Sequence, residues 1–246
     1  MMKKLLLASS VLVSFAAAGS VYAADVGEIN HDWSGVYVGL TAGAATLYFD
    51  HQIEVFGDDY AEDGVLSDGT YSRQGSGFIG GGTIGLNLQH DSIVFGLEAD
   101  YSFVNASATT GDYYGASDDT DVGSVTTELA SLGTLRGRLG FAMDHLLVYG
   151  TAGLAMGDVS VDQFDEYEDE NSPGEESSVR YGWTAGAGVE YAATENMSVK
   201  AEVLYYDLGS ESLGYGEDYS PDVGDYGEYE NEVSGIVARA GVNFNF

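Results

Sequence analysis

Apolar and polar residues alternate with period two over eight stretches of the chain. These stretches lie at residues 33–49, 77–89, 93–104, 127–143, 146–157, 179–192, 197–208 and 233–246. Alternation of this kind is typical of β-strands whose two faces meet different surroundings. The pattern therefore predicts a protein built from eight strands.

The two faces of these strands differ strongly in polarity. In the last stretch one face carries Ile236, Ala238, Ala240, Val242, Phe244 and Phe246, and the other carries Gly235, Val237, Arg239, Gly241, Asn243 and Asn245. In 93–104, Glu98, Asp100 and Ser102 oppose a face of large apolar residues. A continuous apolar face suits lipid, and a face of glycine and charge suits a narrow lumen.

The connections between the stretches alternate between short and long. Short connections fall at 90–92, 144–145 and 193–196, and long polar ones at 50–76, 105–126, 158–178 and 209–232. Tight periplasmic turns and long external loops are typical of outer-membrane barrels. The sequence thus predicts an all-β fold: an eight-stranded antiparallel up-and-down transmembrane β-barrel with four long external loops and both termini in the periplasm.

The first residues have the pattern of an export signal. Lys3 and Lys4 precede an apolar run from Leu5 to Gly19, and Val21-Tyr22-Ala23 suits a signal peptidase. As a helix this run would reach only about 22 Å, less than the roughly 30 Å of a membrane core. We expect a signal peptide at 1–23, a periplasmic lead-in at 24–32 and the barrel at 33–246.

Removing this signal leaves a very acidic chain. Six basic residues remain against 40 acidic ones. Such a charge argues against nucleic acid and against anionic surfaces as partners. The chain has no cysteine, which rules out a disulfide framework and a lipoprotein anchor.

Several segments resemble a known family. They are 33–39 (Trp-Ser-Gly-Val-Tyr-Val-Gly), 95–101, 135–140 and 148–155, in this order along the chain. Together they resemble the small alphaproteobacterial outer-membrane proteins, called the porin family or opacity-like surface antigens. The resemblance implies a barrel akin to the transmembrane domain of OmpA. The end of the chain, with Val242, Phe244 and Phe246, resembles the aromatic signal read by the barrel-assembly machinery.

Charged residues on the polar face form the most informative cluster. Four acids and four bases fall three to eight residues from the predicted periplasmic turns: Glu98, Asp100, Arg136, Arg138, Glu190, Lys200, Glu202 and Arg239. With Arg180, the predicted strands hold five of the six remaining bases. We expect the four bases of this layer to cross the lumen to the four acids.

The long connections are rich in acids and tyrosines. Segment 158–178 alone carries nine acidic residues. Two interpretations stay open for these acids: a solvated surface whose charges repel one another, or a site for divalent cations, which carboxylates bind well. The tyrosines would also suit an adhesive surface.

The sequence predicts no enzyme and no cofactor. The four histidines, His31, His51, His90 and His145, are spread so that no two are expected to share a site. The predicted function is a structural outer-membrane protein and surface antigen that supports envelope integrity, with at most a narrow polar pore. Its expected surroundings are outer-membrane lipid and lipopolysaccharide. The alternatives are a porin for small solutes and an adhesin that acts through its loops.

Overall fold

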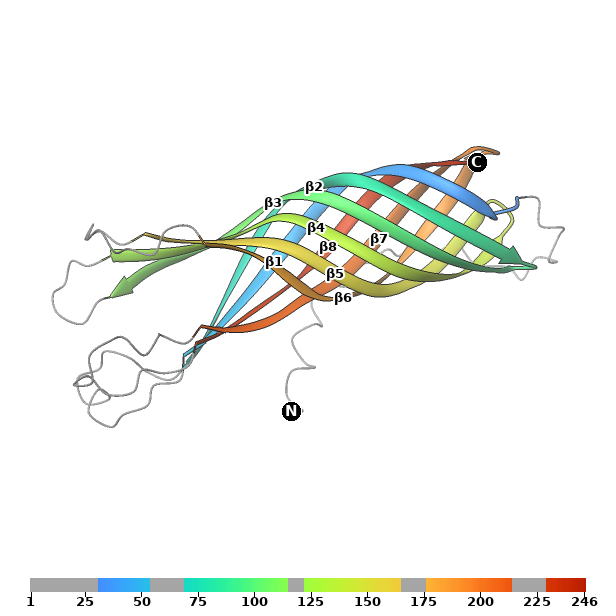
Figure 1. Cartoon of the computed structure of the whole chain (residues 1–246). Helices are drawn as coiled ribbons and strands as arrows, with labels where there is room; N and C mark the ends of the chain where they lie inside the picture. The colour runs from blue at the N-terminus through green and yellow to red at the C-terminus, as the bar shows by residue number, and fades with distance from the viewer. Residues whose placement is uncertain (1–30, 54–68, 115–121, 165–175, 214–228) are drawn as a thin grey trace, which may run out of the picture.

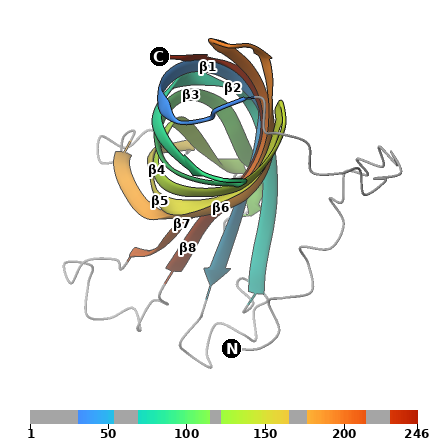
Figure 2. The same ribbon diagram turned by 90° about the vertical axis from the view of Figure 1, so that its right-hand side faces the viewer.

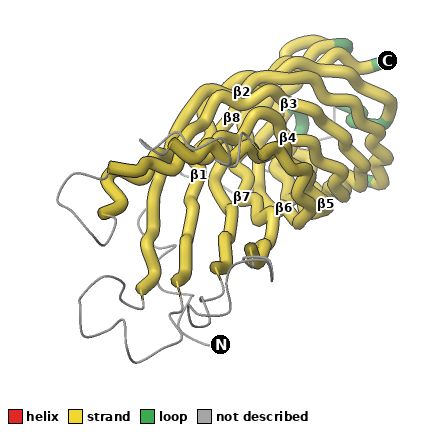
Figure 3. The backbone as a smooth tube through the Cα atoms, turned by 60° about the vertical axis from the view of Figure 1, so that its left-hand side comes forward, coloured by secondary structure: helices red, strands yellow, loops and turns green. Residues whose placement is uncertain are grey.

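The computed structural model describes residues 31–53, 69–114, 122–164, 176–213 and 229–246. These residues form eight strands: β1 (Gly35–Ile53), β2 (Gly69–His90), β3 (Ile93–Tyr114), β4 (Val122–Met143), β5 (Leu146–Phe164), β6 (Glu176–Thr194), β7 (Met197–Leu213) and β8 (Tyr229–Asn245). The strands wrap into one barrel (Figures 1 and 3). None of the described residues belongs to a helix long and apolar enough to cross a membrane.

Each strand pairs antiparallel with its neighbours in the sequence, and β1 pairs with β8 to close the ring. The last residue takes part in this closure, because the Phe246 amide donates to the Val36 carbonyl at 2.9 Å. Viewed along the barrel, the strands form a complete ring (Figure 2). The predicted all-β fold, an eight-stranded antiparallel up-and-down barrel, is therefore confirmed.

The three short connections are two-residue turns, at 91–92, 144–145 and 195–196. Asp91 and Asp144 have φ angles of 52° and 54°, in the left-handed region that aspartate tolerates in tight hairpins. We call this end of the barrel the turn end and the opposite end the far end. The predicted turn at 144–145 is confirmed, and the other two were right in place but too long, because β2 continues through His90 and β6 through Thr194.

The predicted strands were too short at the far end. For example, β3 runs to Tyr114 rather than to residue 104, and β2 begins at Gly69 rather than at residue 77. Paired strands in water need no apolar face, so their ends carry no alternation to detect. Arg73 and His51, expected in loops, consequently lie in β2 and β1. The rest of the predicted loops, the predicted signal peptide and most of the lead-in fall outside the described residues.

The wall has the predicted two faces. Leu40, Phe103 and Leu154 are among the large apolar side chains exposed on the outside. Inside, two buried apolar clusters lie at different heights. Trp33, Val94, Ala142, Leu147, Tyr149 and Ala192 form the turn-end cluster, and Leu47, Ile79, Leu129, Leu204 and Val237 belong to a larger far-end cluster. The sequence did not predict the far-end cluster.

The ring of paired strands does not extend over their full length. In the described residues, the β6–β7 ladder ends at Trp183 and Asp207, and the β2–β3 ladder ends at Ser76 and Ser107. Beyond these points β7, β8, β1 and β2 continue as one four-stranded lobe, and β3 to β6 continue as another. Figure 1 shows the two lobes diverging at the far end.

Candidate functional site

The eight charged residues singled out in the sequence lie together inside the barrel. They come from β3, β4, β6, β7 and β8, and all eight are buried: Glu98, Asp100, Arg136, Arg138, Glu190, Lys200, Glu202 and Arg239. Their formal charges cancel, with four acids and four bases. Burial of so many charges is tolerated only where each is paired.

Arg136 and Arg239 form the centre of this network. Arg136 reaches three carboxylates: Asp100 at 2.9 Å, Glu202 at 3.0 Å, and Glu98. Arg239 bridges Asp100 at 2.9 Å and Glu202 at 2.7 Å. Planar guanidinium groups can hold two carboxylates in fixed directions. The two arginines therefore tie β3, β4, β7 and β8 together across the lumen.

The remaining bases complete the layer. The Lys200 ammonium lies 2.8 Å from Glu98, and the Arg138 guanidinium pairs with Glu190. Glu190 also accepts hydrogen bonds from Ser198 at 2.5 Å and from Asn243 at 2.7 Å. Each carboxylate of the layer thus has at least two donors, which offsets much of its desolvation cost.

The ion pairs of the layer do not all cross the lumen, although the sequence predicts that they do. Glu98 and Arg136 are register partners on adjacent strands, as are Glu202 and Arg239. Glu190 and Lys200 are also register partners, yet Lys200 reaches Glu98. The long contacts, such as Arg239 with Asp100, are the ones that span the lumen.

Three tyrosines fill the lumen by lying over glycines of the neighbouring strand. The register pairs are Tyr37 with Gly85, Tyr149 with Gly188, and Tyr206 with Gly235. A Cβ atom at Gly188 would lie 2.6 Å from the Tyr149 ring, so only glycine leaves room.

Two of these tyrosines also join the charge layer. The Tyr37 hydroxyl donates to Glu98 at 2.6 Å. The Tyr149 ring lies 3.8 Å from the Arg138 guanidinium, a cation–π contact. Sequence reasoning missed these contributors, although the alternation places both on the polar face.

Residues just before β1 close the turn end. Trp33 is 4% exposed and packs in the turn-end cluster instead of beginning a strand. Its backbone N–H donates to the side-chain oxygen of Gln89 at 2.8 Å. The backbone N–H of Gln89 in turn donates to the Ser34 hydroxyl at 3.0 Å. The chain leading into β1 crosses the mouth of the ring in Figure 2.

Two histidines meet at this mouth, contrary to the expectation that none would share a site. His31 stacks edge-on against Trp33 at 4.8 Å and lies 6.0 Å from the His145 ring. The turn at 144–145 brings the two together, which spacing along the chain could not indicate. Burial, and next the nearby His145, hold the pKa of His31 below its usual value, while Asp32 and the more distant Glu190 and Asp144 act in the opposite direction.

Acidification is expected to loosen this mouth. Because the folded chain lowers the pKa of His31, its contribution to stability is complete above about pH 6.5 and declines as pH falls below it. In a Trp183→Phe variant the remaining Trp33 should therefore shift its emission to longer wavelength between pH 7.5 and pH 5. His31→Gln should abolish that shift, and an unchanged spectrum in the parent variant would contradict the role of His31.

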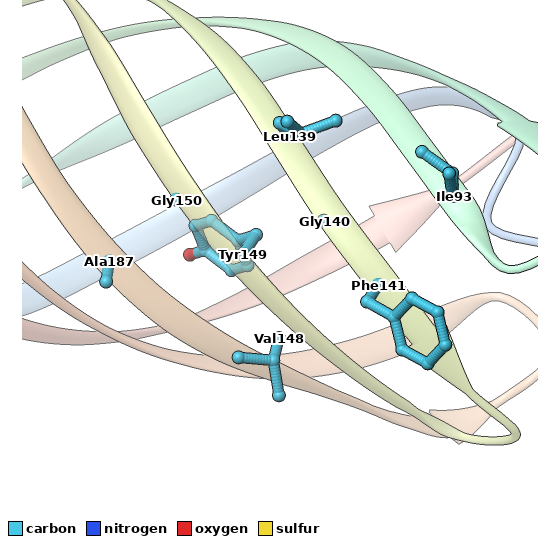
Figure 4. Close-up of a pocket in the computed structure, with 8 residues that line it drawn as sticks. All are labelled: Ile93, Leu139, Gly140, Phe141, Val148, Tyr149, Gly150 and Ala187. Carbon is cyan, nitrogen blue, oxygen red and sulfur yellow. The ribbon is translucent and has the colours of Figure 1, made fainter.

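A shallow apolar groove lies on the outer wall near the turn end. Ile93, Leu139, Phe141 and Val148 line it with small residues such as Gly150 (Figure 4). Lipid chains suit an apolar surface of this kind on the wall of a membrane barrel. Among the described residues no group of three or more histidines or carboxylates could hold a metal ion.

Comparison with known proteins agrees with this architecture. Residues 9–246 match the family model of the outer membrane protein beta-barrel domain. The chain belongs to this family. The family places the protein in the outer membrane as an integral barrel, with its apolar wall in contact with lipid.

Curated relatives in the family include outer-membrane immunogenic proteins. The 31 kDa outer-membrane immunogenic protein of Brucella melitensis is 34% identical over 98% of this chain and 93% of its own length. The 22 kDa outer membrane protein of Rhizobium leguminosarum bv. viciae is 34% identical over 86% of this chain and 78% of its own length. The protein is thus an outer-membrane surface protein, as the sequence predicted.

Solved structures show more distant likeness. OprG of Pseudomonas aeruginosa covers 89% of this chain at 14% identity, with all of its own length aligned and a TM-score of 0.45. The N-terminal barrel of OprF from the same species covers 82% of this chain at 20% identity, with 97% of its own length aligned and a TM-score of 0.36.

Proposed function

We propose that the protein is a structural barrel of the outer membrane whose lumen is closed to solutes, and that it is not an enzyme. The observation that carries this proposal is the filled cross-section of the lumen. Eight buried, mutually paired charges lie between two apolar clusters. A barrel of eight strands has an interior that side chains can fill.

Conductance measurements test the proposal. We expect the purified protein, inserted in planar bilayers, to show no steady single-channel current, and proteoliposomes to exclude small sugars. A porin of known activity serves as the positive control. Steady currents from the wild-type protein would overturn the proposal and favour a porin for small solutes.

The proposal includes an assembly role for the C-terminus. Val242 and Phe244 lie on the outer face of β8, and Phe246, which directly follows the strand, is 81% exposed. An exposed aromatic end on the strand that closes the ring is available to the barrel-assembly machinery. We infer that this machinery recognises the three residues.

Deleting Phe246 is expected to lower the amount of folded protein in the outer membrane. The deletion removes the terminal aromatic ring and the residue whose amide bonds to Val36. The heat-modifiable band in electrophoresis measures the folded fraction. Phe246→Tyr, which keeps an aromatic end, should assemble normally, and wild-type levels after the deletion would rule the signal out.

Divalent cations are a further proposed partner. The support is the number of acids in the long connections expected from the sequence, including nine in the predicted connection 158–178. Carboxylates are the preferred ligands of Ca²⁺ and Mg²⁺. Protection of these segments from proteolysis by millimolar Ca²⁺, beyond that given by NaCl of equal ionic strength, would support cation binding over simple screening.

A further inference from the structure

The apolar groove on the outer wall begins close to the turns that end the barrel. Its lining comes from four adjacent strands, β3 to β6, and includes Ile93, Leu139, Phe141, Val148, Gly150 and Ala187 (Figure 4). The groove has a volume of about 500 Å³. Ile93 pairs with Phe141, and Phe141 with Val148, so these three side chains form its end nearest the turns.

Gly150 keeps this groove open. A Cβ atom at Gly150 would meet only the Gly186 carbonyl oxygen, at 3.9 Å, so packing within the barrel does not require a glycine there. The missing side chain leaves space between the large apolar residues of β4 and β5. Because the wall of an outer-membrane barrel faces hydrocarbon, an acyl chain of a lipid is the group that fills this space.

Two exposed acids lie just below this end of the groove. Asp91 is two residues before Ile93, and Asp144 is three residues after Phe141. With a strand rise of about 3.3 Å per residue and a tilt of about 45°, the acids lie roughly 5–7 Å nearer the water, which is the depth of lipid headgroups. The side chains of Asp91 and Asp144 are 92% and 54% exposed, so both are accessible to a headgroup.

The charge beside the groove selects the kind of headgroup. Residues 86–97 and 139–148 contain no lysine or arginine, and the adjacent Arg138 is buried in the charge layer. The nearest side chains to the two acids are histidines of the same turns, His90 at 3.9 Å from Asp91 and His145 at 3.7 Å from Asp144. An anionic headgroup would meet like charge here. A primary ammonium group would be attracted and could donate hydrogen bonds to both carboxylates.

We propose that the groove and the two acidic turns bind one phospholipid whose headgroup carries a primary ammonium. One acyl chain lies in the groove, and the ammonium lies beside Asp91 and Asp144. The apolar contact holds the chain, and the two carboxylates select the headgroup. The site requires only that the barrel stands in the outer membrane, as its family does, and it does not depend on a closed lumen.

Fluorescence quenching by lipids with brominated acyl chains tests the proposal in bilayers of phosphatidylcholine. Phe95→Trp places a reporter at the register partner of Leu139, beside the groove, and Trp183→Phe removes the tryptophan exposed elsewhere on the wall. Trp33 stays inside the barrel, away from lipid.

Brominated phosphatidylcholine, which matches the bulk lipid, gives the reference without preference. Brominated phosphatidylethanolamine should quench more than this reference and brominated phosphatidylglycerol less. We expect their relative binding constants to differ about three- to tenfold, as two exposed ion pairs permit. Quenching by phosphatidylethanolamine at or below the reference would overturn the proposal.

Substitution of the two acids tests the selection of the headgroup. Asparagine tolerates the left-handed φ angles of 52° and 54° at these positions, so Asp91→Asn combined with Asp144→Asn should keep the turns. The difference between phosphatidylethanolamine and phosphatidylglycerol should then disappear. Glu195→Gln, in the turn between β6 and β7, should preserve it. An equal loss in this control would assign the preference to the general charge of the turn end and overturn the site.

A second pair of variants tests the groove itself. Gly150→Leu fills the groove and should lower the binding of phosphatidylethanolamine to the reference. Ala152→Leu adds the same side chain on the same face of β5 but outside the groove, and should leave binding unchanged. The heat-modifiable band confirms that both variants fold. Unchanged binding in Gly150→Leu would overturn the groove as the site. Conductance is measured in parallel, because a current concerns the closed lumen and not this site.

Discussion

Replacing Glu202 with glutamine is expected to lower the free energy of unfolding by about 3–5 kcal/mol, the usual cost of breaking a buried ion pair. The Glu202 carboxylate holds both Arg136 and Arg239, and its side chain is buried. The amide has the same shape but leaves two buried guanidinium groups short of one negative charge. Urea-induced unfolding in detergent or lipid, followed by electrophoretic mobility, measures the change.

Glu195→Gln is the matched control for this experiment. Glu195 lies in the exposed two-residue turn just before the same strand. Its loss should change stability by less than about 1 kcal/mol, as for other exposed charges. If the two variants unfold alike, the charge layer contributes nothing to stability and the lumen holds enough water to solvate it.

Gly188→Val is expected to destabilise the barrel by about 1–3 kcal/mol, the usual cost of an overpacked interior. A valine Cβ would lie 2.6 Å from the Tyr149 ring and 2.8 Å from the Ala201 carbonyl oxygen. Tyr149 would have to leave its place over the Arg138 guanidinium. Thermal unfolding measures the loss, and near-ultraviolet circular dichroism reports the displaced tyrosine.

Gly137→Val provides the comparison on the outer face. A Cβ there would meet its nearest heavy atom, the Ala152 carbonyl oxygen, at 3.8 Å, an ordinary contact. Valine at this lipid-facing position should be tolerated. If both substitutions destabilise the barrel equally, the cost comes from the loss of glycine's backbone flexibility. The close contact with Tyr149 would then not be the reason why residue 188 is a glycine.

The sequence predicted the membrane-spanning part of the fold well because lipid imposes a strict rule there. Every second residue of a wall strand must be apolar, and this alternation assigned Glu98, Arg136 and Arg239 to the inside. The same rule does not apply beyond the lipid. The far ends of β2 and β3, which continue to Gly69 and Tyr114, were therefore missed.

The partners within the lumen could not be predicted in the same way. Which acid meets which base depends on the tilt and stagger of strands around the ring, so Lys200 contacts Glu98 rather than its register partner Glu190. The far-end apolar cluster escaped notice because its members, such as Leu204, sit on the face expected to be polar. Trp33 fits the alternation of the first predicted strand and was therefore assigned to it. In the structure it lies before β1 and packs in the turn-end cluster at the mouth of the barrel.

The contacts that join the lumen also bear on the order of events during folding. Lys200 and Glu98 are 102 residues apart in the chain, and Arg239 and Asp100 are 139 apart. The carboxylates of β3 therefore cannot form these contacts until β7 and β8 are in place. The ring closes only when β8 pairs with β1. Contacts so distant in sequence slow folding, since long chain segments must be ordered before they form. A chain that stalls before β8 would hold Asp100 without Arg239, so ring closure and charge pairing are expected to occur in a single late step.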